Sequence, residues 1–155
     1  MIPAALTRRA REARTWMMDA CFPLWSREGV GQNGLFLEVL DLTHRPVESG
    51  QTRVRVQARQ TYVFAEALRM GWEPKRAERL IETGLSALTG PCLREDGLAG
   101  RVIDTESRTL KDDQPDLYDI AFGLFGLTQA QAVLPEKAAA GRLQVLSSLD
   151  KLMRD

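Results

Sequence analysis

"NGLFLEVLDLTHRPVES", residues 33–49, returns later in the chain as "DGLAGRVIDTESRTLKD", residues 96–112. The two stretches match at positions separated by 63 residues: Gly34 with Gly97, Leu35 with Leu98, Leu40 with Ile103, Asp41 with Asp104, Arg45 with Arg108, and Val47 with Leu110. A fixed spacing of this length indicates a repeated structural unit. The segments that follow each copy should therefore correspond as well.

Apolar residues at helical spacing predict five helices, over residues 4–21, 52–70, 74–89, 115–130 and 135–153. The first, third and fifth are amphipathic, and the third and fifth begin at prolines. The expected buried stripe of the third is Ala77, Leu80, Ile81, Gly84, Leu85 and Leu88, with Arg79, Glu82 and Ser86 opposite. The expected stripe of the fifth is Leu143, Leu146, Leu149 and Met153.

The helices over 52–70 and 115–130 carry apolar side chains on nearly every side, which predicts that both are buried. Each copy of the repeated loop is thus followed by a buried helix and then by an amphipathic one. Alternation of this kind describes two concentric layers of helix. The predicted fold class is an all-α, α/α-toroid type of helical repeat, in which inner helices surround a central cavity.

Composition and charge argue against several classes of function. The 155 residues include 21 basic and 21 acidic side chains, and the basic ones are scattered, which argues against a nucleic-acid partner. No stretch approaches the ~20 apolar residues that span a bilayer, so we expect no membrane insertion. Cys21 and Cys92 form neither a metal-binding pair nor a secreted disulfide framework, so we expect no metal site and a cytoplasmic location.

Three motifs in order carry a family resemblance: "GLFLEVLD" followed by "RPV", then "VRVQARQTYVFAEAL" followed by "GW", then "LYDIAFGLFGL". Over about residues 16–134 the chain resembles the N-terminal part of the N-acylglucosamine 2-epimerase family, which includes cellobiose 2-epimerases and mannose isomerases. The resemblance implies an (α/α)6 barrel that interconverts sugars at C2, by epimerisation or by aldose–ketose isomerisation, without a cofactor. "QARQTYVFAEA" and "DLYDIAF" are more similar to the mannose isomerase branch.

The resemblance also implies substrate-binding residues. Arg59 matches the arginine that holds the sugar oxygens near the reacting carbon, and Tyr118 matches an aromatic hydroxyl placed on the sugar. Glu38 is a weaker candidate for sugar contact. The residues alone leave other roles open: Arg59 or Arg55 could pair with Glu66 in a structural network, and Tyr118 could be a packing tyrosine.

In this family two histidines of later repeats carry the acid–base chemistry. The single histidine here, His44, lies in the loop "LTHRPV", where relatives place a turn glycine, so we interpret it as a solvent-facing turn residue. The sequence offers no obvious carboxylate with a raised pKa as an alternative base. No catalytic residue is therefore assigned, and we expect the chain to be inactive alone.

Length leads to the same expectation. Six units of 63 residues would need about 380 residues, and 155 residues supply about two and a half units. We therefore expect residues 1–155 to form a single N-terminal fragment of the barrel domain, truncated relative to the full-length parent that binds the sugar. Exposed inner faces predict self-association or association with a missing C-terminal polypeptide. Alternative functions are a non-catalytic helical interaction module or a carbohydrate-binding remnant.

Overall fold

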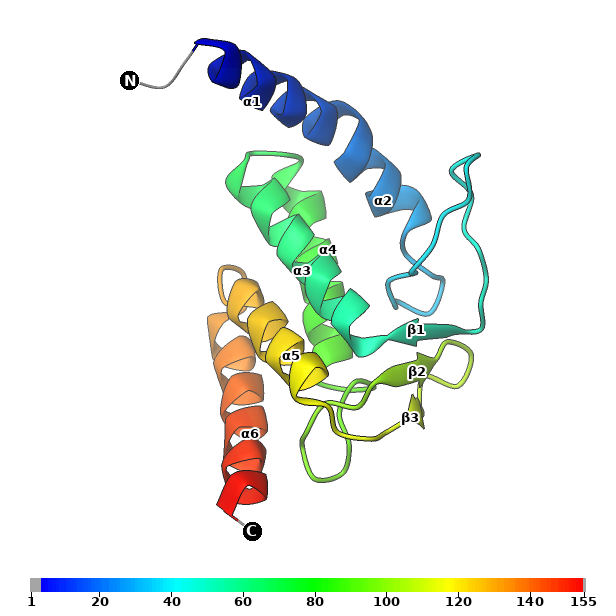
Figure 1. Ribbon diagram of the computed structural model, residues 1–155, viewed down its shortest axis with the longest axis vertical. Coiled ribbons are helices and arrows are strands. Elements are labelled where there is room, and N and C mark those ends of the chain that lie inside the picture. The colour runs from blue at the N-terminus through cyan, green and yellow to red at the C-terminus, as the bar shows by residue number, and fades with distance from the viewer. Residues whose placement is uncertain (1–3, 155) are drawn as a thin grey trace.

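The computed structural model describes residues 4–154 (Figure 1). Its elements in chain order are α1 (Ala4–Trp16), the π-helical turn η1 (Met17–Cys21), α2 (Phe22–Glu28), β1 (Gln51–Arg53), α3 (Val54–Arg69), α4 (Pro74–Leu88), β2 (Val102–Asp104), β3 (Leu110–Asp112), α5 (Leu117–Ala130) and α6 (Pro135–Arg154). All five predicted helices are present, so the helical fold class is confirmed, with one small sheet added to it.

The helices form two layers. α3 packs against α4 and α5, and α5 packs in turn against α4 and α6, so that α3 and α5 lie side by side with α4 and α6 behind them (Figure 1). The predicted stripe of α4 is buried throughout, from Ala77 to Leu88, and Arg79 and Glu82 opposite it are exposed. Periodicity therefore identified the packed face of this outer helix correctly.

The predicted stripe of α6 is wrong at three of its four residues. Leu149 packs against the core, but Leu143, Leu146 and Met153 are 67%, 49% and 70% exposed. The buried residues of α6 are Ala138, Gly141 and Val145. Small residues face α5 because the helices approach closely there: a Cβ on Gly141 would lie 3.1 Å from Leu127 Cδ2. Leu143 and Leu146 form a second apolar face that no described element of this chain covers.

The first helix is also longer than predicted. The helical path continues beyond residue 21 through η1 and α2 to Glu28, because Phe22 donates its N–H to the Met17 carbonyl in a π-type bond and Pro23 sits in the first turn of α2, where no N–H is needed. Residues 5–16 are exposed on every side, and Met17 and Met18 are the residues of the predicted helix that pack against the core. The expected packing of an amphipathic first helix is therefore confined to its C-terminal end.

The two loops of the sequence repeat contain equivalent backbone hydrogen bonds. Gly31 donates to the Leu35 carbonyl at 2.9 Å, and Arg94, 63 residues later, donates to the Leu98 carbonyl at 2.9 Å. The isolated bridge between Val30 and Phe36 has its counterpart between Leu93 and Ala99. Gly34 and Gly97 occupy the same turn position with φ of 75° and 84°, a conformation that glycine adopts without strain.

The second half of each loop is closed by an aspartate. The Asp41 carboxylate accepts hydrogen bonds from the N–H groups of Thr43 and Arg45, and the Asp104 carboxylate accepts from those of Glu106 and Ser107. Backbone and side-chain hydrogen bonds of this kind hold the pKa of both carboxyls below the ordinary value. Both aspartates therefore order tight turns.

The match between the two loops shifts by one residue after these aspartates, which corrects two predicted pairs. Leu40 bridges Pro46, whereas Ile103 pairs with Leu110, and the left-handed residues are His44 (φ 65°) and Arg108 (φ 57°). Arg45 therefore does not correspond to Arg108, nor Val47 to Leu110, because the second turn is one residue longer. His44 lies exposed at this turn, as predicted.

The sheet ties the two repeats together. β2 lies between β1 and β3, antiparallel to both, with Thr52 opposite Ile103. β1 continues directly into α3, and the Val54 N–H at the start of α3 donates to the Arg101 carbonyl at 3.0 Å. The sheet consequently fixes the position at which α3 begins.

The approach of α5 to the rest of the core gives a test of this packing. A Cβ on Gly126 would lie 2.8 Å from the Ala58 Cα and 2.7 Å from Leu88 Cδ1, whereas a Cβ on Gly123 would meet nothing closer than Ala99 Cβ at 3.7 Å. Gly126→Ala should lower the free energy of unfolding by about 1–3 kcal/mol through overpacking. Gly123→Ala should leave it unchanged or raise it by up to about 1 kcal/mol through helix propensity.

Urea unfolding of both variants and of the unmodified chain measures these changes. The two glycines are buried in one helix and differ by a single turn, so propensity affects both alike. Equal effects of the two substitutions would contradict the close packing of α5 on α3.

Candidate functional site

The prediction that α3 and α5 are buried all round is wrong along one stripe of each helix. Arg59, Tyr62 and Arg69 on α3 and Tyr118 and Phe125 on α5 are exposed, and they line the seam where the two helices meet. Residues three and four apart share one face of a helix, so each helix presents a continuous row. We call these two facing rows the α3–α5 seam.

Arg59 and Tyr118, the two residues singled out from the sequence, meet on this seam. Arg59 donates from Nη2 to the Tyr118 hydroxyl at 2.8 Å, and its Cζ lies 4.4 Å from the centre of the Phe122 ring. A cation over an aromatic face is attracted by the ring's negative quadrupole. Because the Tyr118 oxygen accepts from Arg59, its own O–H points elsewhere and can donate to another oxygen.

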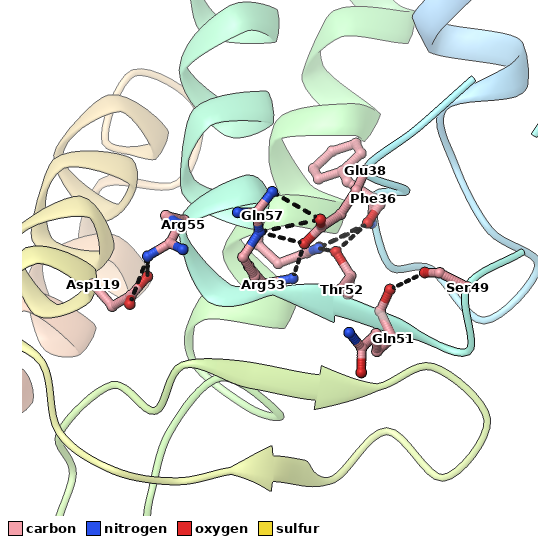
Figure 2. Close-up of polar contacts among 9 residues, drawn as sticks. All are labelled: Phe36, Glu38, Ser49, Gln51, Thr52, Arg53, Arg55, Gln57 and Asp119. Atoms are coloured by element: carbon pink, nitrogen blue, oxygen red, sulfur yellow. Dashed lines mark hydrogen bonds and ion pairs between the residues drawn. The ribbon is translucent and has the colours of Figure 1, made fainter. Parts of the chain in front are cut away.

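A second pair on the seam was missed by the sequence reasoning. Arg55 donates from Nη1 to Asp119, at 3.1 Å from Oδ2 and 3.3 Å from Oδ1, and the Asp119 side chain is completely buried (Figure 2). Burial raises the pKa of Asp119, and the charge of Arg55 opposes that rise. The sequence could have pointed to Asp119, because it is a charged residue among apolar ones in "DIAFGLFGL", just as Arg59 is in α3.

Beyond these two pairs, toward the C-terminal ends of α3 and α5, the seam consists of aromatic and then polar side chains. The rings of Tyr62 and Phe125 pack with centroids 5.0 Å apart. One turn further on, Arg69 contacts Glu66 and donates from Nη2 to Gln129 Oε1 at 2.7 Å. The alternative of a network between Glu66 and Arg55 or Arg59 is therefore wrong, because Arg69 is the partner of Glu66 and each of the other arginines has a partner on α5.

Glu38 lies away from the seam, beside the sheet. Its carboxylate accepts from the backbone and side chain of Arg53, with Arg53 Nη2 2.9 Å from Oε2 (Figure 2). Next to it Gln57 is fully buried and brackets the backbone of Phe36, donating to its carbonyl and accepting from its N–H at 2.8 Å. Glu38 has a well-defined role in holding the loop to the start of α3.

The remaining candidates add little to this site. Burial raises the pKa of the Cys92 thiol, and partial burial does the same for Cys21. Within residues 4–154 no group of three metal-ligating side chains comes together. The helices of that range are each too short or too polar to cross a membrane.

Comparison with known proteins identifies the chain's relatives. The family described as N-acylglucosamine 2-epimerase (GlcNAc 2-epimerase) matches residues 34–155. The chain belongs to this family. Of its relatives, the mannose-6-phosphate isomerase of Rhizobium meliloti (strain 1021) is 33% identical over 147 residues, which make up 94% of this chain and 36% of that protein.

Solved structures of two sugar epimerases share the fold. A sugar epimerase from a ruminal bacterium superposes with a TM-score of 0.80 at 19% identity, over 91% of this chain and 36% of its own. The cellobiose 2-epimerase of Spirochaeta thermophila DSM 6192 also gives 0.80, at 16% identity, over 96% and 38%. The chain thus spans little more than a third of the length of this relative and of these two structures, as the repeat count predicted.

The site and the core should respond differently to substitution. Arg59→Ala and Tyr118→Phe should each lower the free energy of unfolding by less than about 1 kcal/mol, because both side chains are exposed. Gln57→Ala should cost about 1–3 kcal/mol, because it leaves the buried backbone groups of Phe36 without partners. Urea titration of the three variants measures this contrast, and an Arg59→Ala cost as large as that of Gln57→Ala would make Arg59 a structural residue.

Proposed function

We propose that this chain supplies part of the sugar site of an epimerase or isomerase that acts at C2 of an aldose, with Arg59 and Tyr118 binding the substrate. The observation that carries the proposal is the 2.8 Å hydrogen bond between these two residues, which come from separate helices and were selected independently by the family motifs. Family membership supports a sugar as the ligand.

The chemistry of the pair fits this reaction. Removal of the C2 proton of an open-chain aldose moves negative charge onto the C1 oxygen. A guanidinium and a phenolic O–H directed at that oxygen would stabilise the enediolate. Arg59 has further N–H donors besides the one used by Tyr118, so both side chains can reach the same oxygen.

We further propose that the chain alone does not catalyse. A general base must reach the C2 proton. His44 lies on an exposed turn of the loop before β1. Asp119, although its pKa is raised, is fully buried with both oxygens held by Arg55. Neither meets the requirement, so a base would come from the part of the family's length that this chain does not span.

A fusion of this chain to the remaining part of the Rhizobium meliloti relative tests the function. The chain alone should not exchange the C2 proton of mannose, N-acetylmannosamine or cellobiose with D2O in ¹H NMR, and the fusion should exchange at least one. Tyr118→Phe in the fusion should slow exchange by about tenfold or more. Thr83→Ala, which removes a hydroxyl from the outer helix α4, is the control and should not.

A folded fusion that leaves all three sugars unchanged would overturn the catalytic proposal. Sugar binding by the chain alone, measured by calorimetry and lost in Arg59→Ala, would instead favour a carbohydrate-binding role.

An apolar face supports a proposal about a protein partner. A groove of about 480 Å3 between α5 and α6 is lined by Leu124, Thr128, Ala139, Arg142, Leu143 and Leu146. The repeat indicates what would cover it. Ala58 is buried against α5, whereas its equivalent Ala121 is exposed. When the outer helices are aligned at their first prolines, Pro74 of α4 and Pro135 of α6, buried Leu85 corresponds to exposed Leu146. We propose that a further helix pair of the same kind, from the remainder of a family member, occupies this face.

A complementation experiment tests that surface. The remaining part of the relative, expressed as a separate polypeptide, should bind the chain, and Leu146→Glu should weaken binding at least tenfold, by leaving a charge at the covered position. Leu42→Glu, at a fully exposed leucine on the loop before β1, is the control. Isothermal titration calorimetry measures both. Association of the chain with itself, sensitive to Leu146→Glu, would replace the proposed occupant by a second copy.

A further inference from the structure

The Arg55–Asp119 pair lies directly beside the proposed sugar-binding residues. Asp119 is in the first turn of α5, next to Tyr118, and Arg55 is in the first turn of α3, one turn before Arg59. The Arg55 Cζ is 5.5 Å from the centre of the Tyr118 ring. A single chain of contacts therefore runs from Asp119 through Arg55 and Tyr118 to Arg59.

Tyr118 needs such support because little else holds it. Its side chain is 51% exposed, and its ring has an edge contact with Phe122, at 4.9 Å between centroids, besides the contact with Arg55. Its hydroxyl would have no fixed place opposite Arg59 if the ring could rotate into solvent. Arg55 can restrain the ring only if its own guanidinium is restrained, since a free arginine side chain has many rotamers.

Asp119 supplies that restraint. Its carboxylate is completely buried, and both of its oxygens contact the same Nη1 of Arg55. A guanidinium held by a buried carboxylate cannot swing toward water without leaving that carboxylate unpaired, which is costly. The Arg55 side chain, 23% exposed, is thus pinned at the inner edge of the seam.

We propose that Asp119 is a positioning residue, which fixes Arg55 against the Tyr118 ring and thereby holds the Tyr118 hydroxyl at the Arg59 guanidinium. The placement is independent of the sugar. Its effect on the reaction rests on the proposed function.

The placement can be tested on the chain by NMR of its arginine side chains. The Nε–Hε signal of Arg59 should be shifted by the ring current of Phe122, and that of Arg55 by Tyr118. Asp119→Asn keeps the side-chain size and removes the charge; it should move the Arg55 signal and the Arg59 signal toward random-coil positions. Arg69, on the same helix with partners Glu66 and Gln129, should keep its signal.

Two further variants separate positioning from stability. Asp96→Asn removes another arginine–aspartate ion pair, with Arg94 Nη2 2.9 Å from Oδ2 of a half-exposed carboxylate, and should leave the Arg59 signal in place. The double variant Arg55→Met/Asp119→Asn removes both charges and leaves none buried without a partner, so it should fold even if Asp119→Asn does not. An Arg59 signal unchanged in a folded Asp119→Asn or double variant would overturn the proposal.

The fusion enzyme extends the test to the reaction. Asp119→Asn should lower kcat/KM for C2-proton exchange by on the order of tenfold, and it should have no further effect in a Tyr118→Phe background, because both changes act through one hydroxyl. Additive losses would overturn the proposed route through Tyr118. A fusion with no activity would refute the proposed function, and the arginine signals would still decide the positioning role.

Discussion

The close approach of α5 to α3 is the constraint on which the site depends. Gly126 lies against the backbone of Ala58, at a distance that admits no Cβ on the glycine. With the two helix axes drawn together, side chains at the edges of this contact can reach across it. The Arg59–Tyr118 and Arg55–Asp119 contacts both require this spacing, because short bonds between residues of different helices tolerate little separation.

The starts of α3 and α5 are fixed by different interactions, and the two interactions are consistent with each other. The sheet anchors the first turn of α3 through the bond from Val54 to Arg101, while Asp116 caps α5 by accepting from the Tyr118 N–H at 2.8 Å. Both inner helices therefore begin at the same end of the molecule. Their first two turns carry the polar part of the seam, so the loops and the sheet determine where charged groups meet.

Much of this could be predicted from the sequence because repetition and periodicity are local properties. The loop repeat, the five helices and the buried stripe of α4 followed from spacing alone. The contact between Arg59 and Tyr118 did not, because the two residues are 59 positions apart and meet only through the placement of α3 against α5. Family resemblance selected both residues without showing that they touch.

The errors have a common physical origin. Leu143 and Leu146 of α6 were predicted to be buried because apolar side chains are usually covered, and the apolar composition of α3 and α5 likewise predicted both helices to be buried. Only the missing repeats led us to expect exposed inner faces. Hydrophobic pattern reports which faces a chain can bury, and the neighbours present decide which it does bury. Asp119 was overlooked because charged side chains are usually exposed. Its burial depends on a partner, Arg55, that lies 64 positions away.

Solvent access connects this geometry to activity. Arg59 and Tyr118 are exposed, and a charge in contact with water stabilises a developing oxyanion far less than the same charge in an enclosed site. Walls contributed by further helix pairs would remove water from the seam and strengthen the Arg59 and Tyr118 contacts without moving either residue. Enclosure and a base are thus separate requirements, and the same additional helices would satisfy both.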